Sequence, residues 1–338
     1  MKSLLFQVLL VSVVVLAQTV GAQTPALRLA KVITFEGVKG EFDHFAIDLA
    51  RNRLYLAAED QKTVEVLDLA TSKHIASISL FARPHGLVFL PGSSTLIVAD
   101  GGDGTAKFVD VDGPKVSNSV KTALRADSVA YDAGARTVFV ANGGVVAKLD
   151  YSLLTAISAN QARSLGELRI DSKILEALAV EQSGTRLFLN LMDKNQVDVI
   201  DKTKRELLTS WPLPDAEQPS AMALDEAQQR LFVGCRKPAR LLVLDTTSGK
   251  TVASLPSIGH ADDAFYDASR KRIYVSGGEG AVSVYQQRGP DEYEQLPNVA
   301  TGAGAKTSLF VPELKKLFVA VPAGSDGRSQ VMIFDTNP

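Results

Sequence analysis

The sequence is poor in cysteine: its 338 residues contain a single one, Cys235. One cysteine excludes an intramolecular disulfide, and it excludes every zinc or iron–sulfur site built from several thiolates. Because Cys235 ends the apolar run Leu231–Cys235, we expect it to pack as a small apolar side chain.

An excess of charge of one sign is also missing, since 36 Lys and Arg stand against 38 Asp and Glu. A protein that binds nucleic acid neutralises phosphates with a basic surplus, so we expect no nucleic-acid partner. The 46% of hydrophobic residues is in turn far too high for a disordered chain.

Only one hydrophobic run is long, Leu4–Ala17, and it is shorter than the roughly 20 residues of a membrane-spanning helix. Lys2 precedes it and the small residues Val20–Ala22 follow, so residues 1–22 have the pattern of a secretory signal peptide cleaved before Gln23. The residue directly after the cleavage position is Gln23 and not cysteine, which excludes a bacterial lipoprotein. We expect a periplasmic or extracellular protein without a transmembrane segment after cleavage.

A short pattern recurs seven times: a basic or small residue, two or three apolar residues, then a small residue. The copies open at residues 53, 95, 137, 186, 230, 272 and 316, which places successive copies 42 to 49 residues apart. An apolar run precedes each copy, and a run that usually ends in aspartate, a turn and a more polar strand follow it. Four strands in about 40–45 residues are typical of one propeller blade. The sequence therefore predicts an all-β, seven-bladed β-propeller that forms a single domain over residues 23–338.

Helical periodicity is weak throughout this region. Residues 151–163 alone are compatible with a helix, and we expect them to account for the seven extra residues of the longest interval.

The two ends of the chain complement each other. The seventh unit stops after its third strand, at Asp335, and an unassigned strand, Leu29–Phe35, precedes the first unit. Pairing the N-terminal strand with the C-terminal blade would close the ring and remove its open edges.

The repeat resembles the YVTN family of seven-bladed propellers, which includes YncE-like periplasmic and surface-layer proteins. The matching residues are triplets such as Tyr274–Ser276 and the stretch Val243–Ser254, and the resemblance covers the whole mature chain. Units three and six depart from it, because no Gly-Lys turn follows Asp150 and Gln286 replaces the aspartate at the strand end. Since related propellers include binding proteins, lactonases and lyases, the resemblance implies the fold and leaves the function open.

The innermost strand of each blade lines the central channel, so its first residues meet at one mouth. Ten residues before each copy lies a column without an apolar member: Asp43, His85, Asp127, Glu176, Ser220, Asp262 and Lys306. Flanking positions add further polar residues: His44, Arg83, Arg125, His260 and Asp263. The sequence predicts these twelve residues as a ligand-binding mouth.

The column carries a charge of about −3 with neutral histidine, which favours a cation, a metal or a cationic ligand. Neutral imidazole together with carboxylate suits a divalent metal ion, and the candidate ligands are His44, His85, His260 and Asp262. The fourth histidine, His74, lies on an outer strand, where we expect it to be solvated.

Three interpretations of the mouth stay open: a water-filled structural ring, a ligand-binding site and a catalytic centre. Ser220 has no recognisable base, so nothing supports a serine hydrolase. We favour an exported, monomeric protein that binds a small molecule or a protein partner at this face without chemistry of its own. The alternative is a metal-dependent lactonase- or lyase-like enzyme that uses the same mouth.

Overall fold

The computed structural model describes residues 25–324 and 327–336. The expected signal peptide, residues 1–22, lies outside the described residues. In the part of the chain that is described, no helix is long and apolar enough to cross a membrane.

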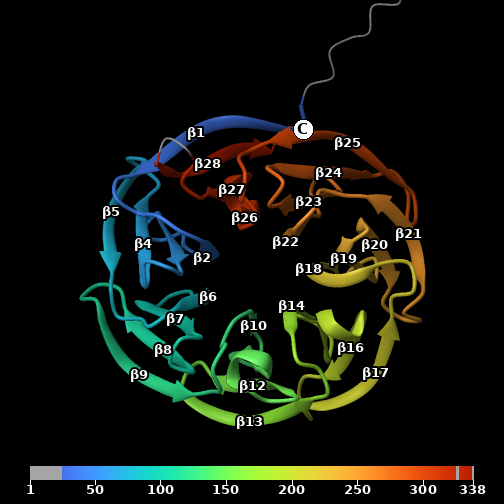
Figure 1. Ribbon diagram of the computed structural model, residues 1–338, viewed down its shortest axis with the longest axis horizontal. Coiled ribbons are helices and arrows are strands. Elements are labelled where there is room, and N and C mark those ends of the chain that lie inside the picture. The colour runs from blue at the N-terminus through green and yellow to red at the C-terminus, as the bar shows by residue number, and fades with distance from the viewer. Residues whose placement is uncertain (1–24, 325–326, 337–338) are drawn as a thin grey trace, which may run out of the picture.

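Seven four-stranded sheets stand in a ring around a central axis (Figure 1), which confirms the seven-bladed β-propeller. Blade 1 contains β2 (Phe42–Asp48), β3 (Arg53–Ala58), β4 (Thr63–Asp68) and β5 (Lys73–Ile78). Blade 2 contains β6 (Pro84–Phe89), β7 (Thr95–Asp100), β8 (Thr105–Asp110) and β9 (Lys115–Lys121). Blade 3 contains β10 (Val129–Asp132), β11 (Thr137–Gly143), β12 (Ser152–Ser158) and β13 (Arg163–Ile170).

The next three blades follow the same order from the axis outward. Blade 4 contains β14 (Leu175–Val180), β15 (Arg186–Leu191), β16 (Gln196–Asp201) and β17 (Glu206–Pro212). Blade 5 contains β18 (Glu217–Asp225), β19 (Arg230–Lys237), β20 (Ala239–Asp245) and β21 (Thr251–Pro256). Blade 6 contains β22 (Ala261–Asp267), β23 (Arg272–Gly277), β24 (Ala281–Gln287) and β25 (Tyr293–Ala300).

Blade 7 joins the two ends of the chain. It contains β26 (Ser308–Val311), β27 (Lys316–Val321), β28 (Ser329–Thr336) and, as its outermost strand, β1 (Leu27–Phe35). β1 pairs antiparallel with β28, from Leu27 opposite Thr336 to Phe35 opposite Ser329. The predicted closure by the N-terminal strand is therefore confirmed, and Phe35 enters a core shared by blades 7 and 1.

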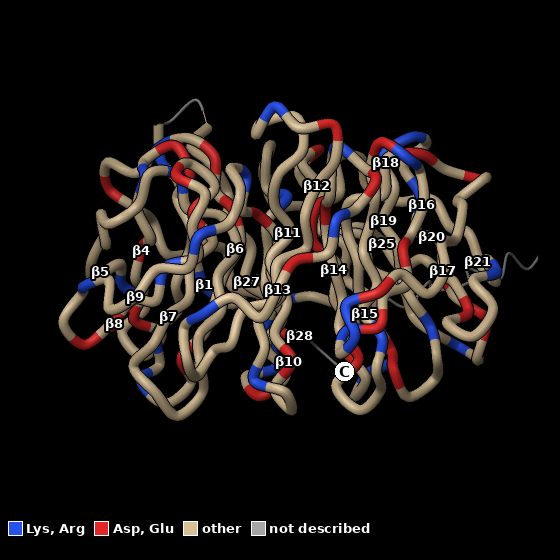
Figure 2. The backbone as a smooth tube through the Cα atoms, turned by 90° about the horizontal axis from the view of Figure 1, so that it is seen from below, with Lys and Arg blue, Asp and Glu red and all other residues tan. Residues whose placement is uncertain are grey.

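The recurring motif of the sequence forms the second strand of every blade. In β3 the side chains from Leu54 to Ala58 are all buried, because a sheet covers each face of a middle strand. Outer strands such as β5 expose most of their residues. Seen edge-on (Figure 2), the charged residues gather mainly in the loops at the two rims of the ring.

Strand-end aspartates build the turns between the third and fourth strands. Asp245 Oδ1 accepts hydrogen bonds from the backbone N–H groups of Thr247 at 3.0 Å and Ser248 at 2.8 Å. Gly249 then adopts a φ of 72°, a left-handed conformation that glycine adopts without strain.

The segment expected to be helical is a strand. Residues 152–158 form β12, which pairs with β11 on one side and β13 on the other. Because β12 lies inside its sheet, nearly all its side chains are buried, and the two-residue alternation of a strand is hidden. The extra residues lie just before it and contain a short 3₁₀ helix, η1 (Gly144–Ala147). Asp150 therefore precedes the third strand, and Ser158 occupies its end.

His74 is only partly exposed, less than its place on an outer strand suggests. Its Nε2 lies 2.6 Å from Oε2 of the buried Glu65, and its ring meets the Phe35 ring edge-on at 5.1 Å. The closing strand β1 lies against β5 and covers part of His74, a contact that joins residues far apart in the sequence.

Candidate functional site

The first residues of the seven inner strands meet around one cavity of about 270 Å³ at the mouth of the channel. All seven members of the polar column line it: Asp43, His85, Asp127, Glu176, Ser220, Asp262 and Lys306. His44, Arg83 and Arg125 join them from the flanking positions. We call this cavity the mouth, and the rim of the ring that contains it the mouth face.

Two of the twelve predicted residues lie elsewhere. His260 is exposed and precedes β22 with a left-handed φ of 54°, and it is not part of the mouth lining. Asp263 lies one step deeper in the channel, where its Oδ1 is 3.3 Å from Nδ1 of His44.

Two charged residues of the mouth, Glu59 and Arg236, were not foreseen. Both lie six residues after the start of the recurring motif, Glu59 just after β3 and Arg236 near the end of β19. The equivalent position in blade 2 is Gly101, and a Cβ there would lie 2.7 Å from Cδ2 of His85. None of the other five residues at this position of the repeat is charged, and three of them are glycine. The two charged residues at this position were the signal that could have revealed them.

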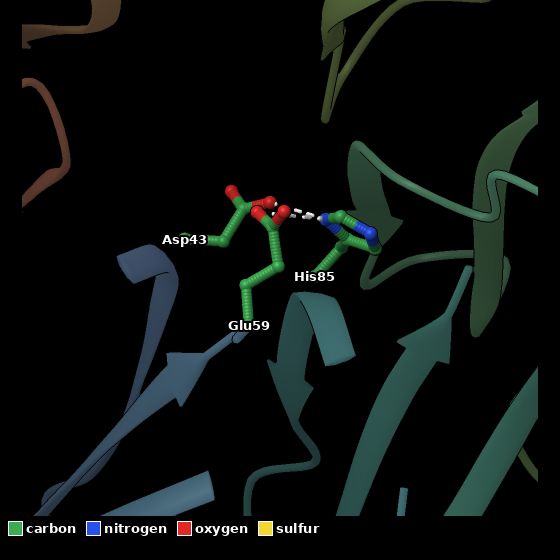
Figure 3. A group of neighbouring side chains, drawn as sticks. All are labelled: Asp43, Glu59 and His85. Atoms are coloured by element: carbon green, nitrogen blue, oxygen red, sulfur yellow. Dashed lines mark hydrogen bonds and ion pairs between the residues drawn. The ribbon is translucent and has the colours of Figure 1, made fainter. Parts of the chain in front are cut away.

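Asp43, Glu59 and His85 form the most compact cluster of the mouth. Nδ1 of His85 lies 2.5 Å from Asp43 Oδ2 and 3.7 Å from Glu59 Oε2. Figure 3 shows both carboxylates facing this one ring nitrogen, whereas the other nitrogen points away from them. On the opposite side of Asp43, its Oδ1 lies 3.3 Å from Nε2 of His44.

The charges of this cluster shift one another's pKa values. Burial acts to lower the pKa of His44 and His85, but the surrounding carboxylates outweigh it and raise both above the ordinary 6.5. Burial acts to raise the pKa of Asp43, and the two imidazoles outweigh it and lower that pKa. Asp43 is therefore an anion between two histidines that favour their charged form.

The remaining carboxylates of the mouth have arginine or lysine partners. Arg125 donates to Glu176 Oε1 at 3.0 Å, and Arg236 donates to Asp262 Oδ1 at 2.9 Å. Burial raises the pKa of Asp262 to about 7 and that of Glu176 above its usual value. Lys306 is more loosely held, 3.5 Å from Glu41 and 3.8 Å from Asp262.

These cations offset the negative charge expected from the column alone. Five carboxylates line the mouth, together with three arginines and one lysine that are charged at every physiological pH. Protonation of His44 and His85 makes six cationic groups against the five carboxylates. The mouth is then slightly positive, and it is suited to an anion as well as to a metal ion.

Asp100 anchors the segment that carries Arg83 and His85 into the mouth. Its fully buried carboxylate accepts hydrogen bonds from the backbone N–H groups of Ala82 and Arg83, both at 2.7 Å. It also lies 2.7 Å from Nζ of Lys107. The start of β6 is thus held by a residue of β7.

Below the mouth the channel lining changes character. A smaller cavity of about 190 Å³ follows, and His44, Ser128 and Ala177 border both cavities. Most of its wall is apolar and comes from one ring of inner-strand residues: Phe45, Leu87, Val129, Leu178, Met222, Phe265 and Leu309.

Two groups of possible metal ligands occur among the described residues, and both include Asp43. One is Asp43, Glu59 and His85, and the other is Asp43, His44 and Asp127; the ligand atoms of each lie within 4.8 Å of one another. Of the four metal ligands expected from the sequence, His44 and His85 each belong to one of these groups. His260 and Asp262 belong to neither group.

Comparisons with known proteins give the fold and no family. No family model matches this sequence, and no curated protein matches it. Among solved structures, a chain of the "Crystal Structure of Mitotic Checkpoint Complex" is similar, with a TM-score of 0.75, 14% identity and 98% of each chain covered. A chain of Kuenenia stuttgartiensis hydrazine synthase has a TM-score of 0.73 at 14% identity, covering 88% of this chain and 97% of that one. At such identities the likeness is one of fold, so the chain is a seven-bladed β-propeller whose resemblance to YVTN proteins stays a prediction.

Proposed function

We propose that this protein is an exported, YncE-like propeller that binds a small organic anion at its mouth without chemistry of its own. The observation that carries the proposal is the set of three arginines and one lysine around a cavity of about 270 Å³. Guanidinium and ammonium groups donate charge-assisted hydrogen bonds to carboxylates and phosphates. Export rests on the pattern of residues 1–22, and N-terminal sequencing of secreted protein should find Gln23 first.

Lys306 offers a sharp test of anion binding, because its ion pairs are long and its loss should disturb the fold little. Lys306→Met should weaken the binding of a carboxylate ligand, found by calorimetric screening, about tenfold. Affinity should also fall as the pH rises, first near pH 7, where Asp262 gains its charge, and further where His44 and His85, whose pKa values lie above 6.5, lose their protons.

The matched control is Lys204→Met, the same change at an exposed turn on the opposite face. It should leave the affinity unchanged. Equal affinities for the wild-type protein and Lys306→Met, or affinity that rises with pH, would contradict anion binding.

A metal-dependent lactonase- or lyase-like enzyme is the second candidate, favoured by the compact group of Asp43, Glu59 and His85. Carboxylates and one imidazole would hold Zn²⁺ or Mn²⁺, which would act as a Lewis acid when bound. Metal and proton compete for Nδ1 of His85, so metal uptake should rise with pH, opposite to anion binding.

Calorimetric titration with Zn²⁺ and Mn²⁺ across this pH range distinguishes the two candidates. Glu59→Gln should reduce metal uptake, whereas Glu41→Gln, an exposed carboxylate that contacts Lys306, should not. Turnover of a lactone that requires metal and disappears in His85→Ala would replace the binding function by the enzymatic one. Absence of metal uptake in chelator-free protein would remove the second candidate.

A further inference from the structure

In five of the seven blades an acidic residue lies at the end of the inner strand, on the face opposite the mouth, always five residues after the polar column. These residues are at most 5% exposed: Asp48, Asp132, Glu181, Asp225 and Asp267. A carboxylate removed from water needs a cation or several hydrogen bonds, so each should have a partner.

In two blades the partner is an arginine three residues later. Arg51 Nη1 lies 2.9 Å from Asp48, and Arg270 Nη1 lies 3.3 Å from Asp267. Blade 5 has Gln228 at this position, which gives its acidic residue only a backbone N–H at 3.1 Å.

In blade 3 the partner comes from the neighbouring blade. Lys202, which follows β16, lies with its Nζ 2.8 Å from Asp132. Blade 6, the neighbour of blade 5, has Gln287 at the position of Lys202. The two residues make the same backbone hydrogen bond: the N–H of Lys202 donates to the carbonyl of Thr185 at 2.9 Å, and that of Gln287 donates to the carbonyl of Lys271 at 2.9 Å. Asp132 of blade 3 is therefore paired with a lysine of its neighbouring blade, whereas Asp225 of blade 5 has the uncharged Gln287 at the equivalent place.

In blade 4 the first residue of the second strand is the partner. Arg186 Nε donates to Glu181 at 2.9 Å. The equivalent Arg230 of blade 5 is engaged elsewhere, 2.9 Å from Asp245 and 2.7 Å from Asp291. All three sources of a cation used in the other blades are thus missing for blade 5.

Asp225 accordingly keeps a buried oxygen unsatisfied. Its Oδ2 has no hydrogen-bond partner within the described part of the chain, although the residue is only 5% exposed. Asp225 lines a cavity of about 380 Å³ between blades 5 and 6, together with Tyr266 and Gln228. The hydroxyl of Tyr266 lies near the Asp225 carboxylate but donates to Gln287 Oε1 at 2.7 Å. Burial raises the pKa of Tyr266, followed by the charge of Asp225 and the approach of its hydrogen-bonding carboxylate.

We propose that this cavity, the Asp225 pocket, binds the ammonium or guanidinium group of a small organic cation, which takes the place of the cation that the other four blades carry. Two cationic residues, Arg288 and the exposed Lys271, also border the pocket. Arg288 is paired with Glu294 at 2.7 Å, so Lys271 is the one that would face a carboxylate at the other end of such a ligand. The chemistry therefore points to a basic amino acid such as arginine or lysine. This site is separate from the mouth and does not depend on the function proposed there.

Calorimetric titration of the purified protein with L-arginine tests the proposal, with L-citrulline as the uncharged ligand of nearly the same shape. Arginine should bind and citrulline should bind at least about tenfold more weakly, because a charge-assisted hydrogen bond to the carboxylate is lost. L-lysine against L-norleucine repeats the comparison for the ammonium group. The mouth variant Lys306→Met should bind arginine as the wild-type protein does.

Two variants locate the binding. Asp225→Asn removes the charge, and Gln228→Arg supplies from within the chain the partner that Asp48 and Asp267 have, so both should lose arginine binding. The second variant keeps the carboxylate and should melt no lower than the wild-type protein, which separates loss of binding from loss of folding. Binding of citrulline as tight as that of arginine, unchanged binding in a folded Gln228→Arg protein, or no binding of arginine and lysine to the wild-type protein would each overturn the proposal.

Discussion

Replacing Phe35 with alanine should lower the free energy of unfolding by about 3–5 kcal/mol, the usual cost of removing a buried aromatic ring. The ring is 1% exposed, and its centroid lies 5.7 Å from that of Phe42 and 5.1 Å from that of His74. It therefore fixes β1, the outermost strand of blade 7, to blade 1 where the ring closes. Urea denaturation of the purified variant measures the change.

Leu29→Ala is the matched control, because Leu29 lies in the same strand and is 48% exposed. It should cost less than about 0.5 kcal/mol, as surface substitutions do. Deletion of residues 23–36 should have a still larger effect than Phe35→Ala, since it leaves β28 as an open edge. If Phe35→Ala and the deletion both unfold at the wild-type urea concentration, β1 does not stabilise the ring.

Asp100→Ala should be about as damaging, with a loss of about 3–5 kcal/mol typical of breaking a buried ion pair. The substitution leaves the backbone N–H groups of Ala82 and Arg83 without their acceptor, and it removes a partner of the half-buried Lys107. Thermal and urea unfolding both measure the loss. Because these residues start β6, binding at the mouth should weaken as well.

Asp103→Ala separates this effect from the simple loss of a charge near Lys107. Asp103 also lies 2.7 Å from Nζ of Lys107, but its side chain is 38% exposed. An exposed ion pair contributes less than about 1 kcal/mol, so this variant should remain close to the wild-type stability. Similar losses in the two variants would show that the backbone hydrogen bonds of Asp100 contribute little.

The repeat made the architecture predictable, because seven copies of one buried strand specify seven blades whatever the loops contain. It also located the polar column, since a residue ten positions before each buried strand must lie at the same height in every blade. The same regularity left β12 unrecognised, because its side chains are buried on both faces and do not alternate.

The sequence did not reveal which charged side chains pair with one another at the mouth. Glu59 and Arg236 reach the mouth from the far ends of second strands, and a column drawn along inner strands misses them. His260 belongs to the expected mouth by its place in the sequence, but its side chain is exposed and stays outside the cavity, whereas the longer Arg125 at the equivalent position enters it. Similarly, Asp225 is one of five equivalent acidic residues, and only the contacts of its neighbours show that it differs.

Because of the apolar ring below the mouth, an anionic ligand can enter and leave the mouth from one end of the channel only. An anion that moved past His44 would leave the cations of the mouth for a wall of Phe, Leu, Val and Met side chains that also carries the Asp263 carboxylate, at a large cost in hydration. Arrival and departure of a polar ligand must then share one path, across the mouth face. A macromolecule that covered this face without touching the ligand would slow association and dissociation by the same factor. It would prolong the residence time of a bound ligand and leave the equilibrium constant unchanged.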